Sequence, residues 1–156
     1  MDRLFAEARS VLMAQIRGRD NKRTETKIVG LLKKSHITGW RRHVAIKFRK
    51  EGLRFGVASD GTVFKKSVRP DFAFPKQMVA LFVDGCFWHG CPKCGRLPKS
   101  QANFWSAKIL RNKERDRFQV HALRQIGWRV VRIREHELHC MDSERFARKI
   151  KFLLRK

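Results

Sequence analysis

The sequence predicts an α/β fold in which a mixed central sheet is flanked by helices. Two segments that suit buried strands, 78–83 and 128–133, lie on either side of a long helical segment, 103–125. A strand–helix–strand crossover of this length favours parallel pairing of the two strands. The 156 residues contain no internal repeat or low-complexity linker. We expect one domain over residues 21–156, preceded by an N-terminal arm, residues 1–20, that becomes ordered on a binding partner.

The first predicted element is a helix over residues 24–34, with Thr24 as its N-cap. Its apolar positions follow helical spacing: Ile28, Val29, Leu31 and Leu32. Glu25 lies on the same stripe, so we expect its carboxylate near the buried face, at the helix end where the dipole favours a negative charge. Simple charge complementation of the dipole would explain Glu25 equally well.

The middle of the chain, residues 36–70, is basic and irregular, with possible short strands over 43–48 and 62–66. Two clearer strands follow it. The first, 71–74, is short, and the second, 78–83, is uniformly apolar, as expected for a central strand covered on both faces.

The long helix over 103–125 leads to the strand over 128–133, and a polar stretch then precedes a C-terminal helix that begins near Ser143. One line along the long helix, at helical spacing, carries Trp105, Ile109, Asn112, Asp116 and Leu123. The polar Asn112 and Asp116 therefore share a face with apolar side chains.

The charge of the chain narrows the class of binding partner. There are 37 Lys and Arg against 14 Asp and Glu, a net charge of +23, and the basic residues run from Arg3 to Lys156. Such a field favours nucleic acid. The sequence has no apolar signal segment, no span of transmembrane length and no basic amphipathic helix, which argues against a membrane partner. We expect a soluble protein of a bacterial-type cytoplasm, associated with the nucleoid.

Three cysteines, Cys86, Cys91 and Cys94, form a C-x4-C-x2-C pattern. In a reducing compartment this clustering indicates a metal before disulfides, although three unligated thiols are the simpler alternative. Zn²⁺ takes four sulfur or nitrogen ligands in a tetrahedron, and a closed set of four would be structural. The candidates for the fourth ligand are His89, His136, His139 and Cys140.

A chain this basic has few carboxylates, so their positions matter. Asp71 begins one predicted strand and Asp84 ends the next, so adjacent strands could bring both to one edge of the sheet. Glu25 and Asp116 are turned inward on their helices. Together these acids suggest a Mg²⁺ site, because Mg²⁺ takes a few carboxylate oxygens, water and substrate phosphate. The alternative is that each acid forms an ordinary ion pair with an arginine.

Several motifs occur in a fixed order. They are Pro70-Asp71-Phe72, Phe82-Val83-Asp84-Gly85-Cys86-Phe87-Trp88-His89, Phe104-Trp105, Lys108-Ile109 with Asn112, Glu114-Arg115-Asp116, Gly127-Trp128-Arg129-Val130 and Glu135-His136-Glu137-Leu138. From about Met13 to Leu138 the chain resembles the very short patch repair endonucleases, and the Gly-Cys-Phe-Trp-His run beside the cysteines is the most specific motif. The acid-bearing strands also resemble the restriction-endonuclease-like nucleases, in a divergent form without the usual lysine. The resemblance implies that fold.

The resemblance also implies a catalytic centre. Asp71 matches the family's principal Mg²⁺ ligand, and the backbone carbonyl of Val83 matches a second. His89 matches the catalytic histidine that activates the attacking water. Glu25 and Asp116 match acids that organise metal-bound waters. Two Mg²⁺ ions on one phosphate would stabilise both the attacking and the leaving oxygen.

Further roles follow from the same resemblance. The positions at which the family binds structural zinc correspond to Cys86, Cys91, Cys94 and His136. The resemblance therefore selects His136 as the fourth ligand. Side chains that wedge into the duplex beside the mismatch correspond to Met13, Phe87 and Trp88. Positions that contact the mismatched pair correspond to Lys108 and Asn112. A place in the core is the alternative for the two aromatics, but adjacent large rings beside metal ligands can hardly both face inward.

Two features depart from the family pattern. Asp84 stands where some members carry histidine, so we expect it to act in catalysis and to bind Mg²⁺ directly. The segment 36–69 is long and unusually basic, and extra DNA contacts there could change the substrate preference.

The sequence therefore predicts a monomeric, Mg²⁺-dependent endonuclease that nicks double-stranded DNA 5′ to the T of a T:G mismatch. One alternative is a nickase of the same fold with another sequence- or structure-specific substrate. The other is a non-catalytic, zinc-containing DNA-binding module, which would leave Asp71 and His89 without a purpose.

Overall fold

A computed structural model describes residues 24–48, 58–61, 63, 67–98 and 101–155 of the chain. The elements in chain order are α2 (Glu25–Lys34), β1 (Arg41–Arg42), β2 (Ile46–Lys47), β3 (Ser67–Val68), β4 (Phe72–Phe74), a 3-10 turn (Pro75–Gln77), β5 (Val79–Asp84), α3 (Ala102–Gln125), β6 (Arg129–Arg134), α4 (Glu135–His139) and α5 (Ser143–Leu154). The predicted N-terminal arm, Met13 and most of the predicted strand 62–66 lie outside the described residues.

The main sheet has the strand order β1-β4-β5-β6. β4 is antiparallel to both of its neighbours, whereas β5 and β6 are parallel, with a register that runs from Val79 opposite Arg129 to Asp84 opposite Arg134. The prediction of a mixed sheet with a parallel crossover is therefore confirmed. In the predicted strand 43–48 only Ile46–Lys47 is a strand, and it pairs with β3 in a separate two-stranded sheet.

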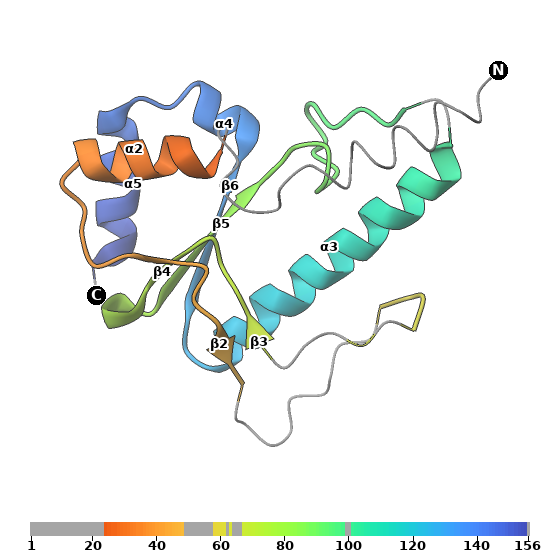
Figure 1. Cartoon of the computed structure of the whole chain (residues 1–156), viewed down its shortest axis with the longest axis horizontal. Helices are drawn as coiled ribbons and strands as arrows, with labels where there is room; N and C mark the ends of the chain where they lie inside the picture. Colours follow the sequence, from red (N-terminus) through yellow and green to blue (C-terminus); the bar gives the residue numbers. More distant parts are fainter. Residues whose placement is uncertain (1–23, 49–57, 62, 64–66, 99–100, 156) are drawn as a thin grey trace.

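The core lies on both faces of the main sheet. On one face Leu81 of β5 packs in a cluster with residues of α2 and α5, including Ile28 and Phe146. On the other face Ala80 and Phe82 pack with Leu123 of α3 and with β2 and β3. Figure 1 shows α2 and α5 together on one side of the sheet and α3 extended along the other. Alternate side chains of β5 thus enter opposite clusters, which is why that segment is apolar throughout.

The helices follow the predicted periodicity closely. On α3, Trp105, Ile109 and Leu123 are buried. On α2, Glu25 is buried as expected, with only 4% of its surface exposed. Thr24 occupies the predicted N-cap position, although its side chain makes no capping hydrogen bond there. Within the described residues no helix is long and apolar enough to span a membrane.

The short helix α4 is the main element that the sequence did not predict. It begins directly after β6 and carries His136 in its first turn. Because β6 runs parallel to β5, the start of α4 lies near the loop that follows β5, where the cysteines are.

Candidate functional site

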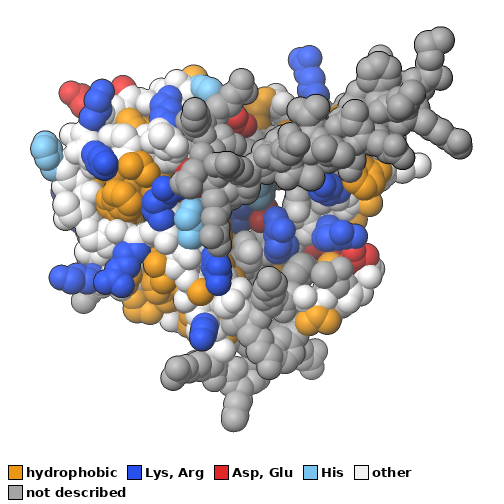
Figure 2. Space-filling view, in the orientation of Figure 1, with side chains coloured by type: hydrophobic (Ala, Val, Ile, Leu, Met, Phe, Trp, Pro, Cys, Tyr) orange, Lys and Arg blue, Asp and Glu red, His pale blue; other side chains and the backbone are white. Residues whose placement is uncertain are grey.

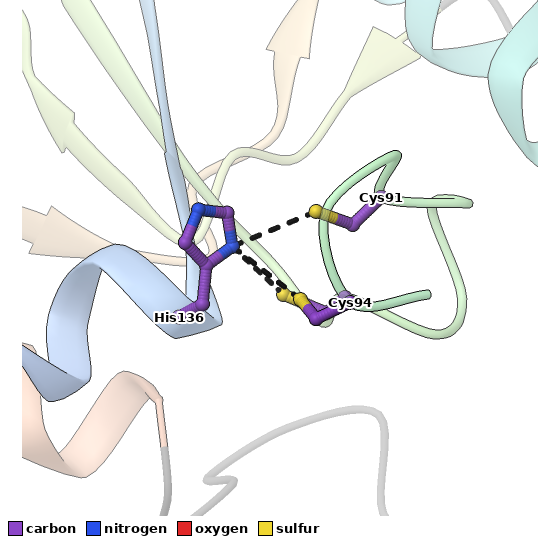
Figure 3. Close-up of side chains that lie close together, drawn as sticks. Cys91, Cys94 and His136 are labelled. Atoms are coloured by element: carbon purple, nitrogen blue, oxygen red, sulfur yellow. Dashed lines mark hydrogen bonds between the residues drawn. The ribbon is translucent and has the colours of Figure 1, made fainter. Parts of the chain in front are cut away.

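The first candidate site is a cluster of three cysteines and one histidine. Cys86, Cys91 and Cys94 come from the loop after β5, and His136 comes from α4. The ligand atoms of the four residues lie within 4.8 Å of one another, and Figure 3 shows two of the thiols facing the imidazole ring of His136. His136 Nδ1 is 3.3, 3.5 and 3.6 Å from the sulfur atoms of Cys86, Cys91 and Cys94. Of the four candidate fourth ligands, the structure brings His136 to the cysteines.

The thiols crowd one another, and this suits a bound cation. Burial raises the pKa of the Cys91 thiol, but hydrogen bonds from the backbone of Lys93 and Cys94 outweigh it and lower the pKa to about 6. The neighbouring thiol of Cys86 and then burial raise the pKa of Cys94 to about 12. Three thiols this close cannot all ionise to thiolates without a positive charge between them. The donor set of three sulfurs and one imidazole nitrogen fits a tetrahedral ion such as Zn²⁺.

Gly95 lets this loop turn back on itself. A Cβ atom at this position would lie 2.7 Å from the backbone nitrogen of Cys91 and 2.8 Å from the carbonyl oxygen of Cys86. The backbone also bonds across the loop, since Gly95 N donates to Cys91 O at 2.8 Å and Cys91 N donates to Cys86 O at 2.9 Å. The close approach of two backbone segments therefore requires glycine here.

The second candidate site surrounds Asp71, the residue immediately before β4. Its Oδ2 accepts the backbone N–H of Val83 at 2.7 Å. Ligand atoms of Glu25, His43 and Asp71 lie within 4.8 Å of one another. Burial is the largest cause that raises the pKa of Asp71, to about 6; the Val83 bond opposes it, and the negative charges of Glu25 and Asp84 add to it. A nearby cation would stabilise the ionised form of a carboxylate in this setting.

His43 is a member of this group that the sequence did not single out. Its Nε2 lies 3.1 Å from Glu25 Oε2, and its backbone N–H donates to Asp71 O at 3.3 Å. Arg42, the preceding residue, donates to the same Glu25 oxygen at 2.7 Å. The backbone of His43 is left-handed, with φ of 51°. Such a conformation costs an ordinary residue about 1 kcal/mol or more and occurs often at functional sites.

A third group connects His89 to two of the predicted acids. His89 Nδ1 lies 2.6 Å from Asp116 Oδ2 on α3 and 3.9 Å from Asp84 Oδ1 at the end of β5. Arg132 of β6 donates to both oxygens of Asp84, at 2.6 and 2.7 Å, and lies 3.0 Å from Asp116. Burial raises the pKa of Asp116, but the bond from His89 and the charges of His89 and Arg132 outweigh it and lower the pKa.

The Asp71 and His89 groups are neighbours at the carboxyl end of β5. Val83 bonds to Asp71, and the next residue, Asp84, bonds to Arg132 and faces His89. The predicted catalytic residues come from α2 (Glu25), the position just before β4 (Asp71), β5 (Asp84), the loop after β5 (His89) and α3 (Asp116). Carboxylates placed this close together can hold a divalent cation, and a histidine beside them can transfer a proton.

An aromatic cluster lies between the cysteine loop and α3, beside this centre. The rings of Phe87, Trp88 and Trp105 pack edge to face, with centroids 5.1 to 6.0 Å apart. The ammonium group of Lys108 lies 5.2 Å from the Trp88 ring. Asn112 donates to the Trp88 carbonyl at 2.8 Å. Phe87 and Trp88 are half-buried and belong to neither core cluster of the sheet.

In Figure 2, Lys and Arg side chains surround acidic and histidine side chains on one face.

Comparison with known proteins identifies the family. A family model described as DNA mismatch endonuclease Vsr matches residues 1–95. The type II nicking enzyme V.XorIIP of Xanthomonas oryzae is 39% identical over 139 residues, which cover 88% of this chain and 86% of that protein. V.NaeI of Lentzea aerocolonigenes is 47% identical over 58% of this chain. The DNA mismatch endonuclease Vsr of Escherichia coli is 40% identical over 40% of this chain.

The aligned regions differ in extent among these relatives. The match spans about half of V.NaeI, 51%, and 41% of the Escherichia coli protein, whereas it spans nearly all of V.XorIIP. The family match includes the Asp71 strand and the cysteine loop, and the V.XorIIP alignment is long enough to reach beyond both. The chain belongs to the DNA mismatch endonuclease Vsr family.

Proposed function

We propose that this protein is a Mg²⁺-dependent endonuclease that nicks one strand of double-stranded DNA 5′ to the T of a T:G mismatch. The observation that carries the proposal is the convergence of the Asp71 group and the His89–Asp116 pair at the end of β5 in a chain of this family. The reaction belongs to very short patch mismatch repair. We further propose that the protein acts as a monomer, because one active site on an asymmetric substrate cuts one strand.

The residues around Asp71 fit a magnesium site. Asp71 and Glu25 offer carboxylate oxygens within reach of one another, and the burial and negative neighbours that raise the pKa of Asp71 favour a bound cation. We propose that Asp71 and the Val83 carbonyl hold Mg²⁺ and that two ions bind in the complex with DNA. Asp84 remains a proposed further ligand, through lone pairs that its bonds to Arg132 leave available. A cation bound there would supply positive charge at the scissile phosphate.

His89 is the proposed general base. Its Nδ1 donates to Asp116, which leaves Nε2 to accept a proton. Water gives this proton to Nε2 as its oxygen forms a bond to phosphorus. The bond from phosphorus to the 3′ oxygen breaks, and that oxygen takes up a proton from solvent. The products are a 5′-phosphate and a 3′-hydroxyl.

The cysteine cluster has a structural role in this proposal. Zn²⁺ held by its four ligands would stiffen the loop that carries Phe87 and Trp88. A stiff loop loses less entropy when its aromatic side chains enter a base stack, and a mismatched step is easier to unstack than a paired one. We propose that Met13, Phe87 and Trp88 form this wedge. We propose that Lys108 and Asn112 contact the mismatched pair.

A second candidate is a nickase with a different target. It is favoured by the names of V.NaeI and V.XorIIP as type II nicking enzymes, and by the basic segment between α2 and β4. Part of that segment lies against α3, where Glu114 accepts bonds from the backbone and hydroxyl of Ser59 at 3.1 Å. Both candidates share the restriction-endonuclease-like fold that we propose from the mixed sheet and its acidic edge.

A nicking assay distinguishes the candidates. The substrates are end-labelled duplexes with one T:G pair in varied sequence contexts, each compared with its matched T:A duplex, with and without Mg²⁺. A Mg²⁺-dependent cut only on the T strand, absent in Asp71→Ala, supports mismatch nicking. Equal cleavage of matched and mismatched duplexes supports the second candidate. Tight binding without cleavage in any context would contradict both.

A further inference from the structure

Arg132 lies at the centre of the side chains around His89. The β5–β6 register places Arg132 opposite Phe82, so that Asp84, two residues along β5, points to the same face of the sheet. Arg132 Nε donates to Asp84 Oδ2 at 2.7 Å, and Nη2 donates to Oδ1 at 2.6 Å. The same Nη2 lies 3.0 Å from Asp116 Oδ1. One guanidinium group therefore joins a carboxylate of the sheet to a carboxylate of α3.

Asp116 is held at both of its oxygens. Oδ1 meets Arg132, and Oδ2 lies 2.6 Å from His89 Nδ1. An ionised carboxylate only accepts hydrogen bonds, so Nδ1 of His89 carries the proton in this 2.6 Å contact, which is far shorter than the 3.4 Å between Arg132 Nη2 and the same nitrogen. Nε2 is then the unprotonated nitrogen of a neutral ring. Because the carboxylate is fixed at its far oxygen by Arg132, it cannot rotate away from the ring without breaking that ion pair.

A guanidinium is the group that can make this junction. Asp84 has 6% of its surface exposed, and Asp116 is largely buried beside it. Asp84 also adds a negative charge beside Asp71, and carboxylates placed this close repel one another unless a cation lies between them. The planar fork of Arg132 reaches both oxygens of one acid and one oxygen of the other. Lysine would carry the charge but not this geometry.

We propose that Arg132 is a positioning residue for His89: its fork holds Asp84 and Asp116, and thereby fixes the histidine ring in the Nδ1–H tautomer with Nε2 ready to accept a proton. Arg132 touches neither the scissile phosphate nor the attacking water in this role. The inference rests on the proposed nicking function for its effect on rate, whereas its effect on the ring of His89 is a property of the free protein.

The test compares wild type with Arg132→Lys and with a matched control, Arg129→Lys. Arg129 lies on the same strand and is exposed, and among the described residues its side chain bonds to the backbone carbonyls of Arg155 and Gln77. Ring-nitrogen NMR reports the tautomer of His89, and His89→Gln identifies its signals among the 6 histidines. We expect an Nδ1–H ring in wild type and Arg129→Lys, and a mixture of tautomers in Arg132→Lys. The single-turnover nicking rate of Arg132→Lys should fall by about 100-fold with little change in DNA affinity.

The outcomes separate this inference from the proposed function. An Nε2–H ring in wild-type protein overturns the inference, and this result does not depend on whether any variant folds. An unchanged tautomer and an unchanged rate in folded Arg132→Lys also overturn it. If wild type nicks no duplex, the proposed function fails, yet the NMR comparison still decides whether Arg132 fixes the ring of His89.

Discussion

Replacing Asp71 with Asn should stabilise the protein at neutral pH when Mg²⁺ is absent. Burial first, and then the charges of Glu25 and Asp84, raise the pKa of Asp71 from its ordinary 3.8 to about 6, against the opposing bond from Val83. A pKa difference of about 2 corresponds to roughly 3 kcal/mol, which the folded state loses when Asp71 ionises. Asn is neutral and can accept the same N–H of Val83, so the variant avoids this loss.

The pH dependence identifies the cause. The stabilising contribution of a raised carboxyl pKa is fully present below about 3.8 and is lost as the pH rises through about 6. We would measure urea unfolding by the fluorescence of the 4 tryptophans. The buffers are freed of Mg²⁺ with a resin beforehand, so that no soluble chelator removes a metal from the cysteine cluster. Asp71→Asn should exceed wild type by about 3 kcal/mol near pH 7.5 and by about half of that near pH 5.

Two results would refute this reasoning. One is a stability difference between Asp71→Asn and wild type that does not change with pH. The other is a variant less stable than wild type near pH 7.5, which would mean that the carboxylate gains more from its neighbours than it loses on burial. Added Mg²⁺ should reverse the order, because a cation that binds only the wild-type site stabilises only that protein.

Three further variants test the remaining parts of the site. Cys94→Ser should lose the metal bound at the cysteine cluster, measured as metal per chain, whereas exposed Cys140→Ser should keep it; equal content in both would contradict the four-residue cluster. His43→Ala should raise the Mg²⁺ concentration needed for half-maximal nicking by about 10-fold, and an unchanged titration would remove His43 from the site. Leu81→Ala should cost about 2–5 kcal/mol in urea unfolding; a smaller cost would mean that β5 is not central to the core.

The elements that the sequence predicts well are those with two buried faces or a clear period. The strand over 78–83 and the long helix are readable because burial dictates residue type at nearly every position along them. The helix α4 escapes prediction, since the five residues Glu135–His139 are too few to show a period. The resemblance to a known family, rather than any spacing, selected His136 as the partner of the cysteines.

Arg132 and His43 were missed for a different reason. Arg132 is one of 37 Lys and Arg, and only the parallel register of β5 and β6 reveals that it faces Asp84. His43 follows β1, a two-residue strand whose antiparallel pairing with β4 brings it beside Asp71. Neither pairing leaves a local pattern in the sequence, because both depend on which segments meet in three dimensions. The signal available in the sequence was the small number of carboxylates in a basic chain, and it does not identify which basic residue contacts each of them.

The contact between Cys86 and His136 has a consequence for stability, because a metal bound at the cysteine cluster would also stabilise the folded state. These two residues are 50 positions apart, and the chain between them contains α3 and β6. A metal ion that joins them closes a long loop, and it does so at the strand ends that carry Asp84 and Arg134. We therefore expect metal uptake at this cluster and completion of the sheet to be coupled. We expect the protein without that metal to be more susceptible to proteolysis of its opened form.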